Sequence, residues 1–385
     1  MKITPFSNGG ADRCWFIVST TTSQSNPDCC SLNPGFTDRV LSRRCFGGTL
    51  SALAAGAFAS HVSSASTAPA PERVRFGQTD LHVTRYCQGT AFRQLPRDDN
   101  PAARNVLYKC LDVGINFFDS AEAYGWGGAE TVLGRVIQGR RDEVVICTKA
   151  TPNHEPGKDS DANTFKVGEQ VTFTRDVLTS KCEGSLKRLG TDYLDLFLLH
   201  GDDDQTAPES IADTMEQLVR AGKIRYWGLS NFTAAKVEQY VQLSSGQRRS
   251  VMSGTEDYYH IAAGLRMNTA LLEVIKRSGL GILAFSPQDC GRLSPGRQEN
   301  TRYGPLIGVL DEIAGQLDTT RPRLLIAWSL AHPAVTTVLG GAESPEHVVD
   351  NVGGTHVEIP DQLLVKLNAA AEEHTQQEFA RSRRK

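Results

Sequence analysis

The chain lacks the features that would commit it to a nucleic acid, an acidic membrane or a bilayer span. Its formal net charge is only −3 over 385 residues, a balance that predicts neither nucleic-acid nor acidic-membrane binding. After residue 70, no run is long and apolar enough to cross a bilayer. With 39% hydrophobic and 22% charged residues, the composition is that of an ordinary soluble globular protein.

The cysteines lack the spacing of a disulfide framework or a metal site. Four of the nine lie before residue 70, and the other five are scattered: Cys87, Cys110, Cys147, Cys182 and Cys290. An odd number of widely spaced cysteines does not indicate a set of disulfides. Neither Cys-x-x-Cys nor His-x-x-x-His spacing is present to suggest a metal site. We therefore expect mostly buried thiols and no bound metal.

Residues 1–70 differ from the rest of the chain. They are rich in Ser, Thr, Ala and Gly, carry few acids, and show no sustained periodicity before Leu41. The pair Arg43-Arg44 precedes a weakly hydrophobic run that is too short to span a bilayer. This pattern resembles a twin-arginine export signal, and the alternative is a disordered tail that happens to contain two arginines. We expect a largely disordered leader, and a periplasmic location if it is a signal or a cytoplasmic one if it is not.

From Pro71 onward, strand-like and helix-like segments alternate. The predicted strands are 86–89, 115–118, 144–148, 194–199, 224–229, a short one near Val251, 281–285 and 335–339. Eight strand–helix units in about 300 residues predict a (β/α)8 barrel over residues 71–385, preceded by a β-hairpin over 74–83. The alternative is an open doubly wound sheet, but no Gly-x-Gly-x-x-Gly motif follows the first strand.

Four polar residues lie at the ends of three successive predicted strands, where barrels carry their catalytic groups. They are Asp119, Tyr124, Lys149 and His200. Each has an ordinary structural explanation, but their common position predicts a proton-transfer site. Lys149, held by Asp119, would make the Tyr124 phenol more acidic. His200 would hold a carbonyl oxygen, and the hydride would come from a cofactor because no side chain donates one.

The motifs between Arg73 and Gly353 resemble those of the aldo-keto reductase superfamily. They are Gly114-x-Asn116-x-x-Asp119-Ser120-Ala121-x-x-Tyr124-Gly125, Glu130, Leu133-Gly134, Thr148-Lys149, 185–189, 193–200, 222–232, 284–287 and 340–351. The resemblance implies an NAD(P)(H)-dependent oxidoreductase that interconverts a carbonyl and an alcohol, with Asp119, Tyr124, Lys149 and His200 as its tetrad and Tyr124 as general acid or base. The alternative is a cofactor-sensing regulatory subunit built on the same barrel.

The resemblance also implies where the cofactor binds. Ser230 and Asn231 match the pair that holds the nicotinamide carboxamide, although they could equally cap the next helix. Phe285 matches an aromatic residue that stacks on the nicotinamide ring, and its alternative role is barrel packing. The matches on the pyrophosphate and adenosine side are Ser286, Gly291, Gly341, Ser344, His347 and Asn351.

Two positions depart from the family pattern. Glu256 stands where the family has a glutamine that contacts the carboxamide, and a carboxylate accepts hydrogen bonds but cannot donate them. Between Gly341 and His347 there are acids, Glu343 and Glu346, where NADP-binding members carry Lys or Arg. A carboxylate repels a 2′-phosphate but can accept hydrogen bonds from a ribose diol, so we expect NAD(H) to be used at least as readily as NADP(H).

The sequence says little about the substrate. Trp126, just past Tyr124, could line the substrate pocket or only pack on the barrel rim. Asp202, Asp203 and Asp204 could bind hydroxyl groups, but a triple acid is more often a solvated loop. We expect a small-molecule carbonyl or alcohol as the partner, with no nucleic acid and no membrane span in the barrel domain.

Overall fold

The computed structural model describes residues 70–92, 99–153, 170–244, 252–263, 269–296 and 302–382. Almost all of the predicted leader, including Arg43 and Arg44, lies outside these ranges, as does most of the polar insert after Pro152. Of the helices within these ranges, none has both the length and the apolar character that crossing a membrane would demand.

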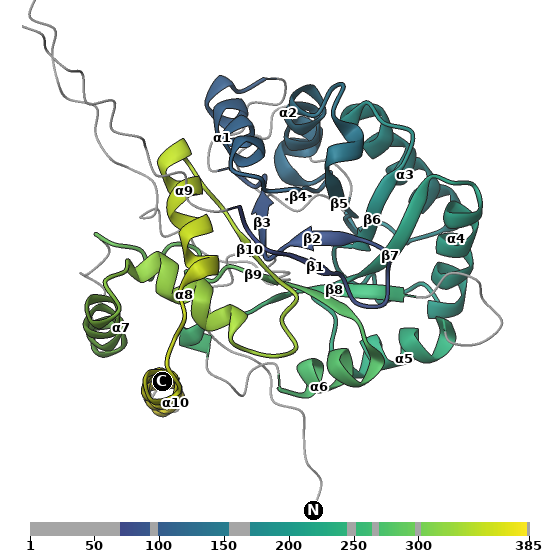
Figure 1. The fold of residues 1–385 in the computed structure, drawn as a ribbon. Coiled ribbons are helices and arrows are strands. Elements are labelled where there is room, and N and C mark those ends of the chain that lie inside the picture. Colours follow the sequence, from purple (N-terminus) through teal and green to yellow (C-terminus); the bar gives the residue numbers. More distant parts are fainter. Residues whose placement is uncertain are drawn as a thin grey trace, which may run out of the picture. The chain divides into compact units, whose positions relative to one another are not determined.

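Eight parallel strands close into a barrel in the order β10-β3-β4-β5-β6-β7-β8-β9 (Figure 1). The strands are β3 (Tyr86–Gly89), β4 (Phe117–Asp119), β5 (Val145–Ala150), β6 (Leu194–Leu199), β7 (Ile224–Ser230), β8 (Met252–Tyr258), β9 (Gly281–Phe285) and β10 (Thr337–Gly340). The predicted (β/α)8 barrel is confirmed, and β3, β6 and β9 have the predicted bounds. Short apolar runs located β6 and β9 because barrel strands are buried on both faces.

Strand β8 is longer than the short strand predicted near Val251. It spans seven residues, most of them polar or small, so its sequence gives little strand signal. The pairing of β7 with β8 shifts register between Trp227 and Gly228. In the register that follows, Ser230 pairs with Glu256, and this sets which β8 side chains face the barrel interior.

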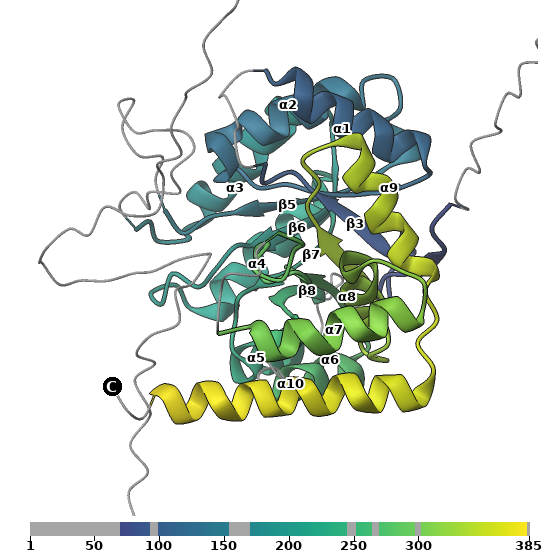
Figure 2. The same ribbon diagram turned by 90° about the vertical axis from the view of Figure 1, so that its left-hand side faces the viewer.

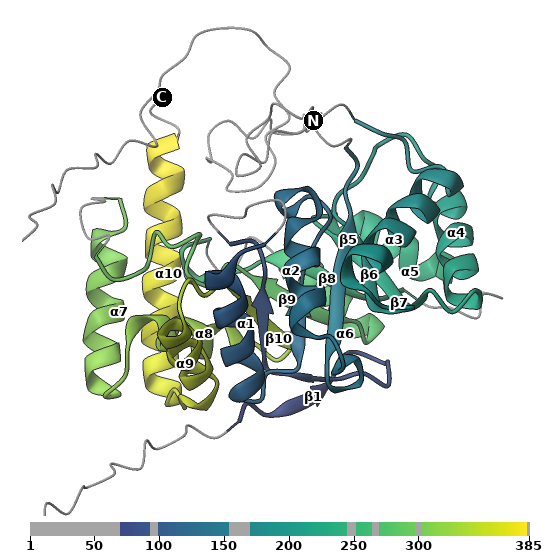
Figure 3. The same ribbon diagram turned by 90° about the horizontal axis from the view of Figure 1, so that it is seen from above.

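Helices surround the barrel, and several begin at a recognisable cap. They are α1 (Pro101–Asp112), α2 (Gly128–Val136), α3 (Arg175–Leu189), α4 (Pro208–Arg220), α5 (Ala234–Ser244), α6 (Thr269–Ser278), α7 (Gly304–Gln316), α8 (Arg321–Leu330), α9 (Pro345–Gly353) and α10 (Asp361–Ser382). The side chains of Asn100, Thr174 and Thr320 accept hydrogen bonds from the first turns of α1, α3 and α8. Helix α10 packs against α7 (Figures 2 and 3).

The predicted hairpin, β1 (Arg73–Arg75) and β2 (His82–Thr84), covers the amino-terminal end of the barrel (Figure 1). The ring of Phe76 is fully buried and packs edge-on to Phe117 with 5.9 Å between the ring centroids. It fits there because β8 and β9 carry glycine beneath it: a Cβ on Gly254 or Gly281 would come within 2.4 or 2.6 Å of the ring. The hairpin thus closes this end with an apolar plug.

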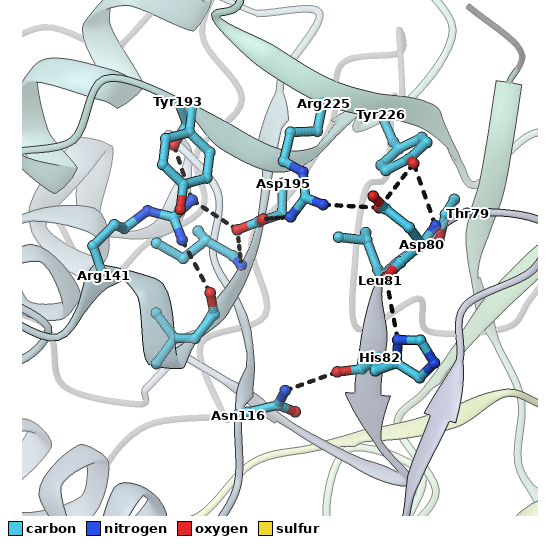
Figure 4. A network of polar contacts seen from close by, with 12 residues as sticks. Thr79, Asp80, Leu81, His82, Asn116, Arg141, Tyr193, Asp195, Arg225 and Tyr226 are labelled. Atoms are coloured by element: carbon cyan, nitrogen blue, oxygen red, sulfur yellow. Dashed lines mark hydrogen bonds and ion pairs between the residues drawn. The ribbon is translucent and has the colours of Figure 1, made fainter.

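A polar network ties the hairpin turn to the strands around it (Figure 4). Buried Asp195 in β6 accepts hydrogen bonds from Arg141 and Arg225, each at 2.7 Å. Arg225 also reaches Asp80 in the hairpin turn at 2.8 Å, and the Tyr226 hydroxyl donates to the same carboxylate at 2.9 Å. The amino-terminal end is therefore occupied by structural contacts, which leaves the carboxyl-terminal end for a functional site.

Candidate active site

The structure brings the four residues of the predicted tetrad together at the carboxyl-terminal ends of the strands. Asp119 is the last residue of β4, and Lys149 is the penultimate residue of β5. His200 follows β6, and Tyr124 opens the short 3-10 helix η1 (Tyr124–Gly127) after β4. All four are at least 95% buried.

The ammonium group of Lys149 is the centre of this cluster. Its Nζ lies 2.6 Å from both carboxylate oxygens of Asp119 and 3.3 Å from the Tyr124 hydroxyl. It also donates to the backbone carbonyl of Ser120 at 2.9 Å, a partner that side-chain motifs do not reveal. Burial would lower the pKa of Lys149, but attraction to Asp119 and Glu256 outweighs burial and raises that pKa well above its usual value. The lysine is therefore a permanent buried cation.

The Tyr124 phenol responds to two opposing influences. Burial raises its pKa above the ordinary value, whereas the Lys149 ammonium lowers it, and burial prevails. The sequence predicted the direction of the lysine effect but not that burial would exceed it. A phenol that keeps its proton at neutral pH is in the form that a general acid requires.

His200 completes the cluster as a neutral imidazole. Its ring meets that of Tyr124 edge to face, with 5.6 Å between the centroids. Burial, followed by repulsion from Lys149, lowers its pKa well below the ordinary value. A neutral imidazole can donate one hydrogen bond to a substrate oxygen without bringing another charge into the site.

The loop after Tyr124 has a left-handed backbone over Gly125, Trp126 and Gly127. Gly127 has a φ of 95°, and a Cβ there would lie 2.4 Å from the Arg188 side chain, so glycine is required. Trp126 has a φ of 48°, which is uncommon for a bulky residue. Its indole Nε1 is buried and has no hydrogen-bond partner among the residues that the structure describes. A buried, unused donor next to Tyr124 is available to a ligand.

Glu256 lies in the same cluster. One of its carboxylate oxygens is 3.2 Å from Lys149 Nζ, and the residue is 3% exposed. The sequence predicted Glu256 as a contact of the cofactor carboxamide and did not predict its contact with Lys149. Asp119, Cys147 and Glu256 offer three possible metal-ligand atoms within 4.8 Å of one another. The Lys149 ammonium, however, already supplies a cation between the two carboxylates.

The predicted carboxamide pair lies beside the cluster. Ser230 ends β7 and is buried, and Asn231 follows with a φ of 64°, which asparagine tolerates better than most residues. The Asn231 amide nitrogen donates to Ser230 Oγ at 3.0 Å and to the His200 carbonyl at 3.2 Å. These contacts hold Ser230 and Asn231 next to His200.

The loop after β9 carries the next predicted contacts. Phe285 ends β9 with a partly exposed ring, 5.4 Å from the ring of Tyr258. Ser286 has a φ of 64°, and its hydroxyl accepts a hydrogen bond from the Cys290 amide at 2.8 Å. Gly291 has a φ of 82°, which suits glycine. The turn is therefore held by its own hydrogen bonds.

The predicted adenosine contacts surround the start of α9. Ser344 caps this helix by accepting from the His347 amide at 3.4 Å, and Gly341 precedes it. Asn351 is buried, and its amide nitrogen donates to the Tyr86 hydroxyl at 2.8 Å and to the Gly341 carbonyl at 3.0 Å. With both donors used inside the fold, Asn351 has only its carbonyl oxygen to offer a ligand.

The triple acid after His200 is largely structural. Asp203 is buried and accepts hydrogen bonds from the backbone amides of Phe173, Gln205 and Thr206. Asp202 and Asp204 both pair with Lys236.

Glu122, which the sequence did not single out, forms an ion pair with Lys181 and accepts a hydrogen bond from the Thr151 amide at 2.9 Å. These contacts anchor the loop that carries Tyr124.

The donors on this rim suit a nicotinamide cofactor. No described atom lies within 4 Å of a Cβ built on Gly341, so the backbone there faces open space. Phe285 offers an aromatic face, and Ser230 and Asn231 offer polar groups next to His200. The residues present therefore fit the group that the sequence implied.

Comparisons with known proteins agree with this fold. The model of the "Aldo/keto reductase family" matches residues 89–372. The chain is 29% identical to "Uncharacterized oxidoreductase YrpG" of Bacillus subtilis, over 77% of this chain and 95% of that protein. It is 30% identical to "Methylglyoxal reductase YeaE" of Escherichia coli, over 76% of this chain and 92% of that protein.

A solved structure of the thermostable aldo-keto reductase Tm1743, in complex with the inhibitor epalrestat, is also similar. It superposes with a TM-score of 0.65 and 26% identity, covering 77% of this chain and 99% of that one. The match of the family model spans the barrel strands from β4 to β10 and all four residues of the cluster. The chain belongs to the aldo/keto reductase family and is a nicotinamide-dependent oxidoreductase.

Proposed function

We propose that the protein interconverts a carbonyl compound and its alcohol, with Tyr124 as the general acid in reduction and the general base in oxidation. The observation that carries this proposal is the contact of a buried ammonium, Lys149, with the Tyr124 hydroxyl at 3.3 Å and with Asp119 at 2.6 Å. A phenol beside a fixed cation can release its proton and return to the neutral form without solvent reorganisation.

In the reductive direction, the neutral His200 imidazole orients the substrate carbonyl oxygen through a hydrogen bond. Tyr124 transfers its proton to that oxygen as negative charge develops on it. The phenolate that remains is stabilised by Lys149, whose own charge is balanced by Asp119. In the oxidative direction the same groups act in reverse, and Tyr124 takes the alcohol proton.

The cofactor would be held by the rim residues described above. Ser230 and Asn231 would bind the carboxamide, Phe285 would pack on the ring, and the turn from Ser286 to Gly291 would cover the pyrophosphate. When bound, the nicotinamide supplies or accepts the hydride that no side chain can transfer.

We further propose that the cofactor is NAD(H) at least as readily as NADP(H). Glu343 and Glu346 are exposed beside the start of α9, and the segment from Gly341 to His347 contains no Lys or Arg. A 2′-phosphate in this place would meet carboxylates, whereas a ribose diol could donate hydrogen bonds to them.

For the substrate, we propose a small aldehyde or ketone, and methylglyoxal is a rational first choice because of the similarity to YeaE. Trp126 would line the pocket, and its free indole N–H would bind a second oxygen of the substrate.

We also propose that the protein is exported through a signal that contains the pair Arg43-Arg44. Mapping the N-terminus of the protein isolated from its native cells tests whether the leader is removed.

The test is the consumption of NADH and NADPH by the purified protein with a panel of aldehydes, ketones and sugars that includes methylglyoxal, run in both directions. Turnover of at least one carbonyl with either cofactor supports the enzyme. Cofactor binding without turnover across the panel would favour the regulatory subunit instead.

A further inference from the structure

Two buried carboxyl groups share one buried cation in this site. Lys149 Nζ lies 2.6 Å from Asp119 and 3.2 Å from Glu256, and each of the three residues is at most 3% exposed. A carboxylate oxygen of Asp119 and one of Glu256 lie within 4.8 Å of each other. Two ionised carboxylates this close in a buried place repel each other, which favours a proton on one of them.

The charge balance leads to the same conclusion. With both carboxyl groups ionised, the group of Asp119, Glu256 and Lys149 would carry a net charge of −1 in a fully buried place. One proton on the pair brings the net charge to zero, which avoids the cost of an uncompensated buried charge. Carboxyl groups that share a site this closely titrate as a pair, and one of them keeps its proton to high pH.

We propose that Glu256 is a positioning residue of the active site that shares one proton with Asp119, so that Lys149 lies between one charged and one neutral carboxyl group. The proposal rests on the proposed function, since it concerns the group that stabilises the Tyr124 phenolate. A protonated glutamic acid can both donate and accept a hydrogen bond, as the family's glutamine does, so the substitution of glutamate for glutamine keeps that ability.

The other titratable groups that face Glu256 leave this balance unchanged. They are Cys147 from β5, Cys87 from β3 and Tyr124 from the loop after β4. Burial raises the pKa of both thiols well above the ordinary value, so they stay neutral. Burial and repulsion from Asp119 likewise raise the pKa of Glu256, in agreement with a retained proton.

The shared proton affects Tyr124 through charge. Asp119 and Glu256 both disfavour the phenolate, and Lys149 favours it. While the pair holds its proton, only one carboxylate opposes the lysine. When the pair loses its proton at high pH, a second negative charge appears, and Tyr124 then releases its proton less readily.

A spectroscopic test needs no turnover. Infrared difference spectra of the full chain, recorded in water and in heavy water at about pH 8, detect the C=O stretch of a protonated buried carboxyl group. Asp257, the next residue on β8, has a pKa raised by burial to about 7 and would add its own band. The comparison is therefore Asp257→Asn against Asp257→Asn/Glu256→Gln.

We expect the band in Asp257→Asn and its loss in the double variant. Titration of Asp257→Asn alone to high pH should also remove the band, so the result stands even if the double variant fails to fold. Absence of the band from Asp257→Asn at about pH 8 would overturn the proposal, as would a band that persists unchanged in the double variant.

A kinetic test uses the pH profile of kcat/KM for alcohol oxidation, which rises as Tyr124 becomes a base. Glu256→Gln should leave this rise at the pH of the wild type, because glutamine and a protonated glutamic acid carry the same charge. Asp257→Asn, on the opposite face of the strand, should leave the profile in place. A rise that moves to lower pH in Glu256→Gln would contradict the proposal, because it would show that Glu256 was charged. If no substrate turns over at all, the proposed function fails, and the infrared test still decides whether the proton is shared.

Discussion

The Lys149 ammonium donates to both carboxylate oxygens of Asp119 at 2.6 Å, although neither residue is more than 1% exposed. An ion pair this deeply buried contributes little stability by itself, because desolvation offsets the attraction. The role of the ion pair is to fix the Lys149 ammonium 3.3 Å from the Tyr124 hydroxyl, which keeps its proton. The predictions below follow from this arrangement and from the groups around it.

Removing the cation should destabilise the fold and abolish activity. Lys149→Met leaves Asp119 and Glu256 buried against each other, which we expect to cost about 3–5 kcal/mol in the free energy of unfolding. Adding Asp119→Asn to Lys149→Met should restore part of that loss but not the activity, because it removes the buried charge that has lost its partner. Urea unfolding measures the stability change, with exposed Lys223→Met as a control expected to change it by less than ~1 kcal/mol. If Lys149→Met were as stable as Lys223→Met, the charges that we assign to Lys149 and Asp119 would be wrong.

The acids beside α9 should control the choice of cofactor. Changing Glu343 and Glu346 to lysine replaces two repulsive charges with attractive ones near a 2′-phosphate. We expect the ratio of kcat/KM for NADPH to that for NADH to rise by roughly 10-fold or more, because each exposed charge contributes up to about 1 kcal/mol. The control is Asp361→Lys/Glu373→Lys, an equal change of charge at two exposed positions on α10. A ratio that moves equally in both proteins would show that the effect is not local.

The indole N–H of Trp126 should contribute to substrate binding. Trp126→Phe keeps an aromatic ring but removes the buried donor that has no partner in the described part of the chain. We expect KM for a dicarbonyl substrate to rise by roughly 2- to 10-fold with little change in kcat, the value of one hydrogen bond. The same variant assayed with a simple aldehyde provides the comparison. Equal effects on both substrates would indicate that Trp126 only shapes the pocket.

The buried carboxyl group of Asp257 should make the free energy of unfolding decrease as the pH rises through about 7. Burial raises its pKa from 3.8 to about 7, so the folded state favours the protonated form. That contribution is fully present below the unfolded-state pKa and is lost as pH rises through about 7. Asp257→Asn should therefore match the wild type near pH ~4 and exceed it by on the order of 2–4 kcal/mol near pH ~8.5. Unfolding free energies at the two pH values test this, and an equal difference at both would refute it.

The sequence predicted the barrel and the tetrad because both depend on local patterns. Apolar runs located β6 and β9 to the residue, and the barrel topology then placed Asp119, Lys149 and His200 on one rim. It is the geometry of a closed parallel barrel, not any single motif, that brings residues from separate strands together.

The contact of Glu256 with Lys149 could not be predicted in the same way. It depends on which face of β8 points inward, and that is set by a register shift between β7 and β8 for which the polar sequence of β8 gives no signal. The net acidity of Tyr124 was missed for a related reason: burial outweighs the lysine, and the extent of burial is a property of the whole fold. The internal hydrogen bonds of Asn351 likewise join segments far apart in the sequence.

The central claim is that the Tyr124 hydroxyl exchanges a proton with the substrate. Its most direct test is the turnover of the best carbonyl substrate by Tyr124→Phe, with cofactor binding followed by fluorescence. Tyr226→Phe, which removes a hydroxyl at the opposite end of the barrel, is the matched control. We expect Tyr124→Phe to bind the cofactor normally and to lose roughly 10²- to 10⁴-fold in kcat, while Tyr226→Phe keeps its rate. A Tyr124→Phe variant that turns over as fast as the control would contradict the account.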